Sequence, residues 1–250
     1  MRRHRYGRRR GQWVERWPPQ GEPTGWTAVL VHGGFWGSAF GCGLMRPLAA
    51  DLAADGWLVA NLEYRRLGAG GGWPATFADV AAATDDLAGA ESVHPDRVVA
   101  VGHSAGGQLA LWLAARAALP PGAPGAAPAV VPAAAVSLAG VCDLVAAAEQ
   151  RVGGRAVRRL LGGEPGEVPD RYALASPAAR LPLGRPQLLV HGGRDRHVPP
   201  SLSLDYAEAA RAAGDEVEVA LDEAAAHMEL IDPRSPAWEA VREWLDGRCP

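Results

Sequence analysis

A serine flanked by glycines is the residue of this sequence best placed to do chemistry. Ser104 is the centre of a G-x-S-x-G motif, Gly102-His103-Ser104-Ala105-Gly106, between an apolar run at 97–101 and a helical pattern at 108–115. A strand, a sharp turn and a helix in that order project a serine hydroxyl above the carboxyl edge of a sheet. We therefore predict that Ser104 is a nucleophile and that the amide of Ala105, at the start of the helix, stabilises an oxyanion.

A nucleophilic serine needs a base to take its proton and an acid to orient that base. Asp195 follows an apolar strand at 187–190, and His227 follows an alternating strand at 216–221. Both residues therefore lie on the carboxyl side of the expected sheet, where open α/β sheets bind ligands. The sequence favours Asp195 as the acid and His227 as the base.

Other residues compete for these roles. His197 is the main alternative base, because it lies only two residues after Asp195, and Asp143 and Asp222 are alternative acids near strand ends. His191, Asp195 and His197 could also be metal ligands, although their spacing fits no common metal motif. We predict that the chain uses no metal and no cofactor.

Three further histidines are assigned structural roles. We expect His103 to pack inside the turn and point away from the substrate. His32 opens a glycine loop and is expected to brace it by hydrogen bonds, whereas His191 ends a strand and is expected to support it.

That glycine loop follows the apolar run at 26–31. Glycines let a backbone approach a substrate closely, so the amides of Gly34 and Phe35 are predicted to complete an oxyanion hole with that of Ala105. Aromatic residues near strand ends and catalytic loops are candidates for a substrate pocket, with ordinary core or rim packing as the alternative. These candidates are Phe35, Trp36, Phe40, Tyr64 and Trp73.

The elements that must position these residues are apolar runs alternating with helical patterns. Strands are predicted at 12–17 (an edge strand), 26–31, 57–62, 97–101, 130–138, 187–190 and 216–221. Helices are predicted at 44–55, 77–89, 108–115, 202–213 and 238–245. This alternation is typical of an α/β protein with one doubly wound, mostly parallel sheet. The segment 140–183 contains only short helical pieces and is expected to form at most a small lid.

Composition points to one globular domain over residues 12–250. The chain has 250 residues, of which 48% are hydrophobic and 21% charged, enough to bury a full core. A net charge of -3 gives no reason to expect a nucleic-acid partner. Three cysteines at unrelated spacings and the lack of a long apolar run predict a cytoplasmic protein without a membrane span. The arginine-rich segment 1–11 is expected to be poorly ordered.

These motifs resemble the α/β-hydrolase superfamily over residues 12–245. The loop His32-Gly33-Gly34-Phe35-Trp36 is similar to the HGG-x-W loop of arylformamidases (kynurenine formamidases) and related small acyl esterases. The segments around Asn61, Asp195 and His227 look like that branch too, although Met228 stands where phenylalanine would be expected. The resemblance implies an α/β-hydrolase fold and assigns the roles already inferred from the residues. Those residues are Ser104, Asp195 and His227, with the amides of Gly34, Phe35 and Ala105.

The expected reaction is acyl transfer from a small carboxylic ester, or from an N-formyl or aryl amide, to water. A short-peptide hydrolase is an alternative, and a non-catalytic ligand-binding protein on a hydrolase scaffold is another. The presence of all three triad residues argues against the non-catalytic alternative. The short segment 140–183 argues against long-chain lipids, and the sequence carries no prediction of oligomeric state.

Overall fold

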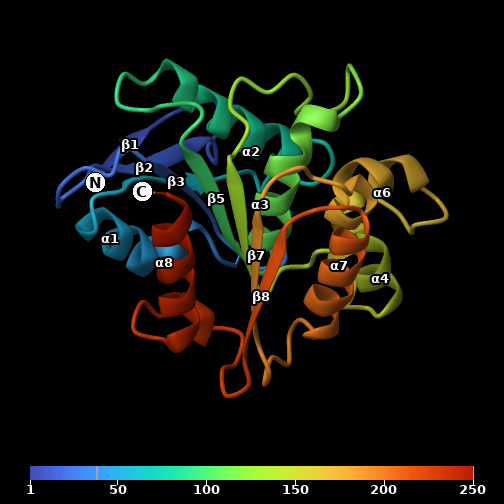
Figure 1. Cartoon of the computed structure of the whole chain (residues 1–250). Helices are drawn as coiled ribbons and strands as arrows, with labels where there is room; N and C mark the ends of the chain where they lie inside the picture. Colours follow the sequence, from blue (N-terminus) through green and yellow to red (C-terminus); the bar gives the residue numbers. More distant parts are fainter. Residues whose placement is uncertain (38, 250) are drawn as a thin grey trace.

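The computed structural model describes residues 1–37 and 39–249, and an eight-stranded sheet runs through its centre (Figure 1). The strand order is β1-β2-β4-β3-β5-β6-β7-β8. Strands β4, β3, β5, β6, β7 and β8 are parallel, and β2 and β1 add antiparallel at one edge. The strands are β1 (Arg2–His4), β2 (Trp13–Trp17), β3 (Thr27–Val31), β4 (Leu58–Glu63), β5 (Val98–His103), β6 (Ala134–Leu138), β7 (Gln187–Gly192) and β8 (Val217–Asp222). The predicted doubly wound α/β fold is confirmed.

Helices cover both faces of the sheet (Figure 1). They are α1 (Arg46–Ala54), α2 (Ala75–Asp85), α3 (Ala105–Ala115), α4 (Leu144–Glu149), α5 (Ala156–Leu161), α6 (Pro169–Ala175), α7 (Ser201–Ala212) and α8 (Pro236–Arg248). None of them, in the described parts of the chain, is long and apolar enough to cross a membrane.

Strand β3 shows why the central strands read as continuous apolar runs. All five of its residues are buried, and successive side chains point to opposite faces. Val29 and Val31 join the core cluster that includes residues of α2 and α3. Ala28 and Leu30 join the cluster that includes residues of α1 and α8. A separate core therefore packs against each face of the sheet at β3.

The parallel strands bring the predicted functional residues to one edge of the sheet. Ser104 directly follows β5, and the loop that begins at His32 follows β3. Asp195 follows β7 by three residues and His227 follows β8 by five. Because parallel strands share their carboxyl edge, segments far apart in the sequence meet there.

The N-terminal segment differs from the expectation of poor order. Arg2–His4 pair antiparallel with Val14–Arg16, so β1, and not β2, is the edge strand. The guanidinium of Arg3 lies 4.1 Å from the ring centroid of Trp13, a cation–π contact. The hydroxyl of Tyr6 donates to the carbonyl of Glu63 at 2.7 Å. Backbone pairing and these two side chains hold the segment against the sheet.

The segment 140–183 forms α4, α5 and α6, of which α6 was not predicted from the sequence. Its buried side chains, among them Leu144, Leu160 and Tyr172, belong to the same core cluster as Leu109 of α3. The apolar faces of these short helices are therefore packed onto the body of the protein, as a small cap beside the carboxyl edge.

Candidate active site

Ser104 lies in a strained turn between β5 and α3. Its backbone angles are φ 56° and ψ -120°, a conformation that costs a non-glycine residue about 1–3 kcal/mol. Two glycines make this turn possible. A Cβ atom on Gly102 would overlap the carbonyl of Gly106, and a Cβ atom on Gly106 would overlap the carbonyl of Val31. The tight packing raises Ser104 above the sheet edge and leaves Ala105 as the first residue of α3.

Asp195 and His227 are hydrogen-bonded to each other across the loops that follow β7 and β8. Nδ1 of His227 lies 2.6 Å from Oδ2 of Asp195. A carboxylate can only accept, so Nδ1 carries the proton and Nε2 is left as an acceptor. This is the tautomer that a general base needs in order to take a proton from a serine.

The Asp195 carboxylate is held in its ionised form. Burial acts to raise its pKa, but hydrogen bonds from His191, His227 and the amide of Val198 outweigh burial and hold the pKa well below its usual range. Its Oδ1 accepts from the amides of His197 and Val198 at 2.8 and 3.0 Å. Backbone amides thus fix Oδ1 of Asp195, and the imidazoles of His191 and His227 lie against Oδ2.

Ser104 and His227 face a common cavity of about 240 Å³, which we call the Ser104 cavity. Most of its wall is apolar, and its polar groups come from the serine and three imidazoles. The lining residues are Gly34, Phe35, Phe40, Leu44, His103, Ser104, His197, His227 and Met228. A small apolar hollow with a few convergent polar groups is the usual form of a small-molecule site.

The loop after β3 brings backbone amides to this cavity. Gly34, Phe35 and Trp36 have φ values of 107°, 51° and 55°, so the chain turns through three successive left-handed residues. In residues 1–37 and 39–249, no hydrogen bond uses the amides of Gly34, Phe35 or Ala105 as a donor. Unpaired amides cost free energy unless a ligand or water accepts from them. The three predicted oxyanion donors are therefore available to a ligand.

His103 differs from its expected orientation. Its Nε2 donates to the backbone carbonyl of His227 at 2.9 Å, and the two imidazole rings lie 4.5 Å apart. Burial, together with the neighbouring His227, lowers the pKa of His103 to about 3. Because His103 is the last residue of β5, its side chain reaches across the sheet edge to the His227 loop. It is a neutral neighbour of the site and not a packing residue turned away from it.

The other histidines have the structural contacts that were expected. Nε2 of His32 lies 3.2 Å from Oε1 of Glu63, and its ring stacks on that of Tyr64 at 4.3 Å. His191 places Nδ1 2.7 Å from Oγ of Ser203, and its Nε2 faces the carbonyl of Val198 at 3.0 Å. His32 Nδ1 also donates to the carbonyl of Gly33 at 2.8 Å, so the expectation that His32 braces the glycine loop and that His191 supports its strand is confirmed.

His197, the alternative base, is exposed and meets Asp195 only through its backbone amide. Its ring lies 5.2 Å from that of His227, at the wall of the Ser104 cavity. The two alternative acids instead accept hydrogen bonds from nearby backbone amides. Asp143 caps α4 by accepting from the amides of residues 145 and 146, and Asp222 accepts from those of residues 224 and 225. Neither aspartate is bonded to His227 in the described chain.

Three predicted pocket residues do not line the Ser104 cavity. Trp36 is fully buried and donates from Nε1 to Gln108 at 3.1 Å, because the left-handed turn directs its indole inward. Tyr64 is fully buried too, and its hydroxyl donates to the carbonyl of His32 at 3.0 Å. Trp73 packs edge-on against Phe77 with ring centroids 5.2 Å apart. Their assignment to the pocket was wrong, and the alternative of packing holds.

The cavity wall includes apolar residues that the sequence did not single out for it. Leu44 precedes α1, and Met228 follows His227 with 47% of its surface exposed. Phe40, a predicted candidate, does line the cavity and is 51% exposed. The position of Met228 beside His227 was the available signal for its role. In the described residues, no group of three or more histidine, cysteine, aspartate or glutamate side chains is arranged to hold a metal ion.

Comparison with known proteins gives one family and a set of structural neighbours. The family model described as BD-FAE matches residues 17–209. A search of curated proteins gave no match.

The structural neighbours share the fold at low sequence identity. A truncated carbohydrate esterase from gut microbiota has a TM-score of 0.83 at 18% identity, covering 98% of this chain and 94% of that one. Est2, an esterase of Thermogutta terrifontis solved with propionate bound, has a TM-score of 0.79 at 24% identity, with 98% and 93% covered. An acetyl ester-xyloside bifunctional hydrolase of Caldicellulosiruptor lactoaceticus has a TM-score of 0.77 at 20% identity, with 94% and 87% covered. These likenesses extend over nearly the whole sheet and its helices.

Proposed function

This chain belongs to the BD-FAE family of α/β-hydrolase-type esterases, and from that premise we propose that it is a serine hydrolase of small carboxylic esters. In this proposal Ser104 is the nucleophile, His227 the general base and Asp195 the acid. The observation that carries it is the 2.6 Å hydrogen bond between Asp195 and His227, at a cavity that Ser104 also lines.

The proposed mechanism has two halves. His227 Nε2 takes the Ser104 hydroxyl proton while Oγ attacks the ester carbonyl, and Asp195 stabilises the imidazolium that forms. The amides of Gly34, Phe35 and Ala105 donate to the oxyanion of the tetrahedral intermediate. Collapse of the intermediate breaks the bond to the alcohol, which leaves with the proton from His227. Water, deprotonated by His227, then attacks the acyl-enzyme, releasing the carboxylic acid and restoring the Ser104 hydroxyl.

The cavity supports a small acyl group. At about 240 Å³ the Ser104 cavity is smaller than the roughly 300–1,000 Å³ of typical ligand pockets. One structural neighbour was solved with propionate bound, and another is named an acetyl ester-xyloside bifunctional hydrolase. Acetyl and propionyl esters, including those of carbohydrates, are the substrates that we propose for this chain.

N-formyl aryl amides are a second proposed substrate class. Two aromatic residues, Phe35 and Phe40, belong to the cavity wall and could pack against an aryl group. The sequence resemblance of the loop 32–36 to arylformamidases favours the same class. Turnover of N-formylkynurenine beside p-nitrophenyl acetate would rank the two substrate classes.

The nucleophile assignment can be tested by covalent labelling. A fluorophosphonate probe should label the native chain, and Ser104→Ala should abolish both labelling and esterase activity, by about 10⁴-fold or more in turnover. Ser137→Ala, which changes a buried serine outside the Ser104 cavity, is the matched control and should keep its label. Labelling that persists in Ser104→Ala would remove Ser104 from the mechanism.

A further inference from the structure

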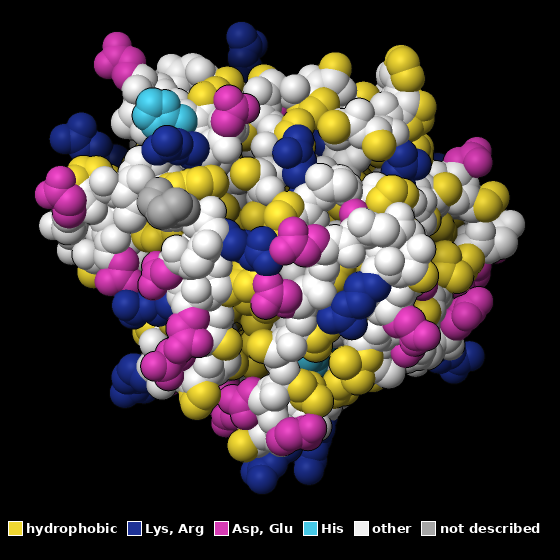
Figure 2. Space-filling view, in the orientation of Figure 1, with side chains coloured by type: hydrophobic (Ala, Val, Ile, Leu, Met, Phe, Trp, Pro, Cys, Tyr) yellow, Lys and Arg dark blue, Asp and Glu magenta, His cyan; other side chains and the backbone are white. Residues whose placement is uncertain are grey.

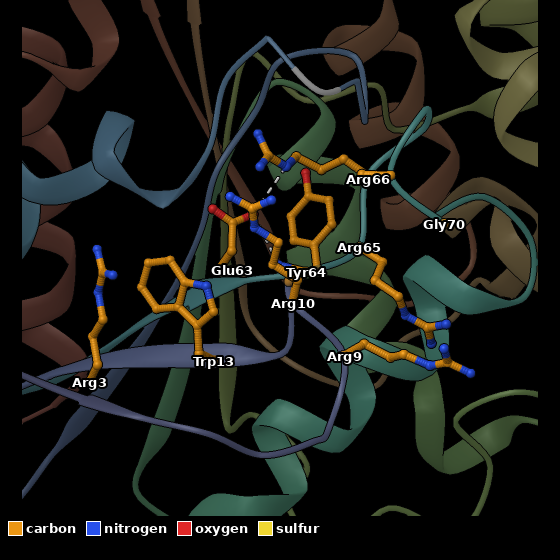
Figure 3. A pocket seen from close by; sticks show the side chains of 11 residues that line it. Arg3, Arg9, Arg10, Trp13, Glu63, Tyr64, Arg65, Arg66 and Gly70 are labelled. Atoms are coloured by element: carbon orange, nitrogen blue, oxygen red, sulfur yellow. Dashed lines mark hydrogen bonds and ion pairs between the residues drawn. The ribbon is translucent and has the colours of Figure 1, made fainter.

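A second cavity, of about 810 Å³, lies at the end of β4 and is built largely from arginines (Figure 3). We call it the arginine cavity. Its lining residues are Arg3, Arg9, Arg10, Gly11, Trp13, Glu63, Tyr64, Arg65, Arg66, Ala69 and Gly70. They come from the N-terminal hairpin and from the segment after β4, two parts of the chain about fifty residues apart in sequence. The proposed esterase mechanism uses none of them.

The charge of this cavity is opposite to that of the chain. Five guanidiniums and one carboxylate line it, a net charge of +4, whereas the whole chain carries -3. On the face shown in Figure 2, in contrast, acidic and basic side chains are interspersed. Within residues 1–37 and 39–249, neither the Arg9 nor the Arg10 guanidinium has an acidic partner within 4.0 Å. Like charges gathered around one hollow repel each other unless an anion lies between them.

Two of the arginines are held in place before any ligand arrives. Arg65 makes a bidentate pair with buried Asp79, with Nε and Nη2 at 2.8 and 2.7 Å from the carboxylate oxygens. Arg66 lies 3.2 Å from Oε1 of Glu63 and donates to the carbonyl of Phe40. Figure 3 shows Arg66 and Arg10 extending over Glu63 and Tyr64 from different segments. Fixed guanidiniums lose little conformational entropy when they bind a planar or tetrahedral oxyanion.

The two cavities lie on the same edge of the sheet. Glu63 ends β4 and Ser104 follows β5, with β3 between these strands. Two strand spacings separate them by about 10 Å. The segment between β3 and α1 contacts both cavities. Phe40 of this segment lines the Ser104 cavity, and the Phe40 carbonyl accepts a hydrogen bond from Arg66 of the arginine cavity. One extended ligand could therefore reach both cavities.

We propose that the arginine cavity binds the carboxylate or phosphate group of an acidic ester substrate whose acyl group lies at Ser104. The inference rests on the proposed esterase function and gives it a substrate class, acylated acidic saccharides. The guanidiniums pair with the anionic group. Arg9 and Arg10 have no acidic partner among the described residues. Their guanidiniums would therefore contribute most of the favourable binding free energy.

Binding can be measured without turnover. In the full chain carrying Ser104→Ala, we expect trigalacturonic acid to bind by titration calorimetry and neutral xylotriose not to compete. Arg9→Ala/Arg10→Ala should weaken this binding at least about tenfold, because charge-assisted hydrogen bonds are lost. Arg2→Ala/Arg8→Ala removes the same charge from the same segment but outside the cavity lining, and should leave binding unchanged.

Three results would contradict the proposals. Equal weakening by the two double variants would overturn the proposal in favour of diffuse attraction. Binding of inorganic phosphate without binding of trigalacturonic acid would also overturn it, in favour of a free-anion site. In the active chain, Arg9→Ala/Arg10→Ala should lower the ratio of kcat/KM for acetylated trigalacturonic acid over acetylated xylotriose. Failure to hydrolyse p-nitrophenyl acetate would instead overturn the esterase proposal and leave the calorimetric result standing.

Discussion

His103 connects the nucleophile turn to the proposed base. It precedes Ser104 in the chain, and its Nε2 holds the carbonyl of His227 at 2.9 Å. Its Nδ1 is buried without a hydrogen-bond partner in the described structure, which suits an imidazole that stays neutral. Protonation would place a second cation beside the His227 imidazolium that forms in the proposed reaction. A neutral His103 therefore suits a base that must become charged.

The lowered pKa of His103 predicts a loss of stability in mild acid. Its pKa is about 3 in the folded chain and 6.5 ordinarily, so below pH 6.5 the unfolded state binds the extra proton. Stability from this group is complete above pH 6.5 and falls by about 1.4 kcal/mol for each pH unit below it. Urea unfolding should thus show about 2 kcal/mol less stability at pH 5 than at pH 7.

The substitution His103→Gln should flatten this pH dependence, whatever it does to stability at pH 7. His94→Gln, at an exposed position, is the control and should keep the native slope. Asp195, whose pKa is lowered, loses its contribution only below its ordinary value of 3.8. Titration of Asp195 therefore does not affect the stability measured between pH 5 and pH 7. An unchanged slope in His103→Gln would contradict a neutral His103.

The proposed acid, Asp195, gives a second prediction at this scale. Asp195→Asn should lower turnover by about 10⁴-fold, because an amide donor at this position favours the wrong tautomer of His227. Asp143→Asn keeps its capping oxygen and lies outside the cavity lining, so it should retain activity. Hydrolysis of p-nitrophenyl acetate by the purified variants measures both effects. A crippled Asp143→Asn beside a normal Asp195→Asn would reverse the assignment.

Side-chain direction explains which residues the sequence could predict. The positions of Ser104, Asp195 and His227 were predictable, because a short loop that follows a parallel strand starts at the carboxyl edge whatever the rotamers of its residues. The aromatic lining was not predictable in the same way. Trp36 and Phe35 are neighbours in one left-handed turn, yet one indole is buried in the core and one phenyl ring lines the cavity. Their φ values, 51° and 55°, are nearly equal, so neither residue type nor backbone conformation marks one of them as a pocket residue.

At the scale of elements, the turn between β5 and α3 permits no side chain at Gly106. Gly106→Ala places a Cβ against the carbonyl of Val31 in β3, and overlap with fixed backbone should cost about 3 kcal/mol or more. Gly247 is a matched helical control in α8, with nothing within 4 Å of its added Cβ. Gly247→Ala should stabilise the chain by about 0.5–1 kcal/mol. Urea denaturation of both variants measures the contrast, and equal effects would contradict the close packing at the turn.

The boundaries of helices and strands were predicted well where a single local sequence feature determines them. Apolar runs predicted β3, β4, β5 and β7 to within two residues at their starts, because strands buried on both faces are mostly apolar. Strand β6 begins at Ala134 and not at 130, since Pro132 has no amide to donate to the ladder. Strand β1 could not be predicted, because three polar residues form a strand there only through pairing with β2. Helix α6 likewise depends on burial of Tyr172 and Ala175.

At the scale of the whole molecule, β1 and β2 extend the sheet beyond β4 (Figure 1). Arg3 and Trp13 of these two strands line the arginine cavity. Arg3, Arg9 and Arg10 are thereby placed beside the end of β4, where their side chains remain exposed to solvent. Composition alone did not indicate this, because the net charge of -3 sums the +4 of the arginine cavity lining and the -7 of all other residues. The positive charge of the arginine cavity indicates an anion-binding site only once the fold is known, because the fold brings the arginines together.

The size of the Ser104 cavity and its short cap predict the acyl preference of the molecule. A volume of about 240 Å³ has room for a small acyl group, and α4–α6 bury their apolar side chains in the core. Within residues 1–37 and 39–249, α4–α6 therefore leave no apolar face unpacked of the kind that a lipid-binding lid presents. One methylene changes discrimination by about 10- to 200-fold at most, so activity should fall by degrees with chain length.

We expect acetyl and butyryl esters to exceed dodecanoyl esters in kcat/KM by about 100-fold or more, since the longer chains must leave part of their apolar surface in water. The measurement is a p-nitrophenyl ester series below the critical micelle concentration, with N-formylkynurenine alongside. Met228→Ala provides a directed check, because Met228 is the half-exposed thioether on the wall beside His227. Its removal should open the cavity and shift the preference toward longer acyl groups, while Leu204→Ala, at an exposed apolar residue outside the lining, should not. A maximum at dodecanoyl, or activation at a lipid–water interface, would contradict a cavity built for small acyl groups.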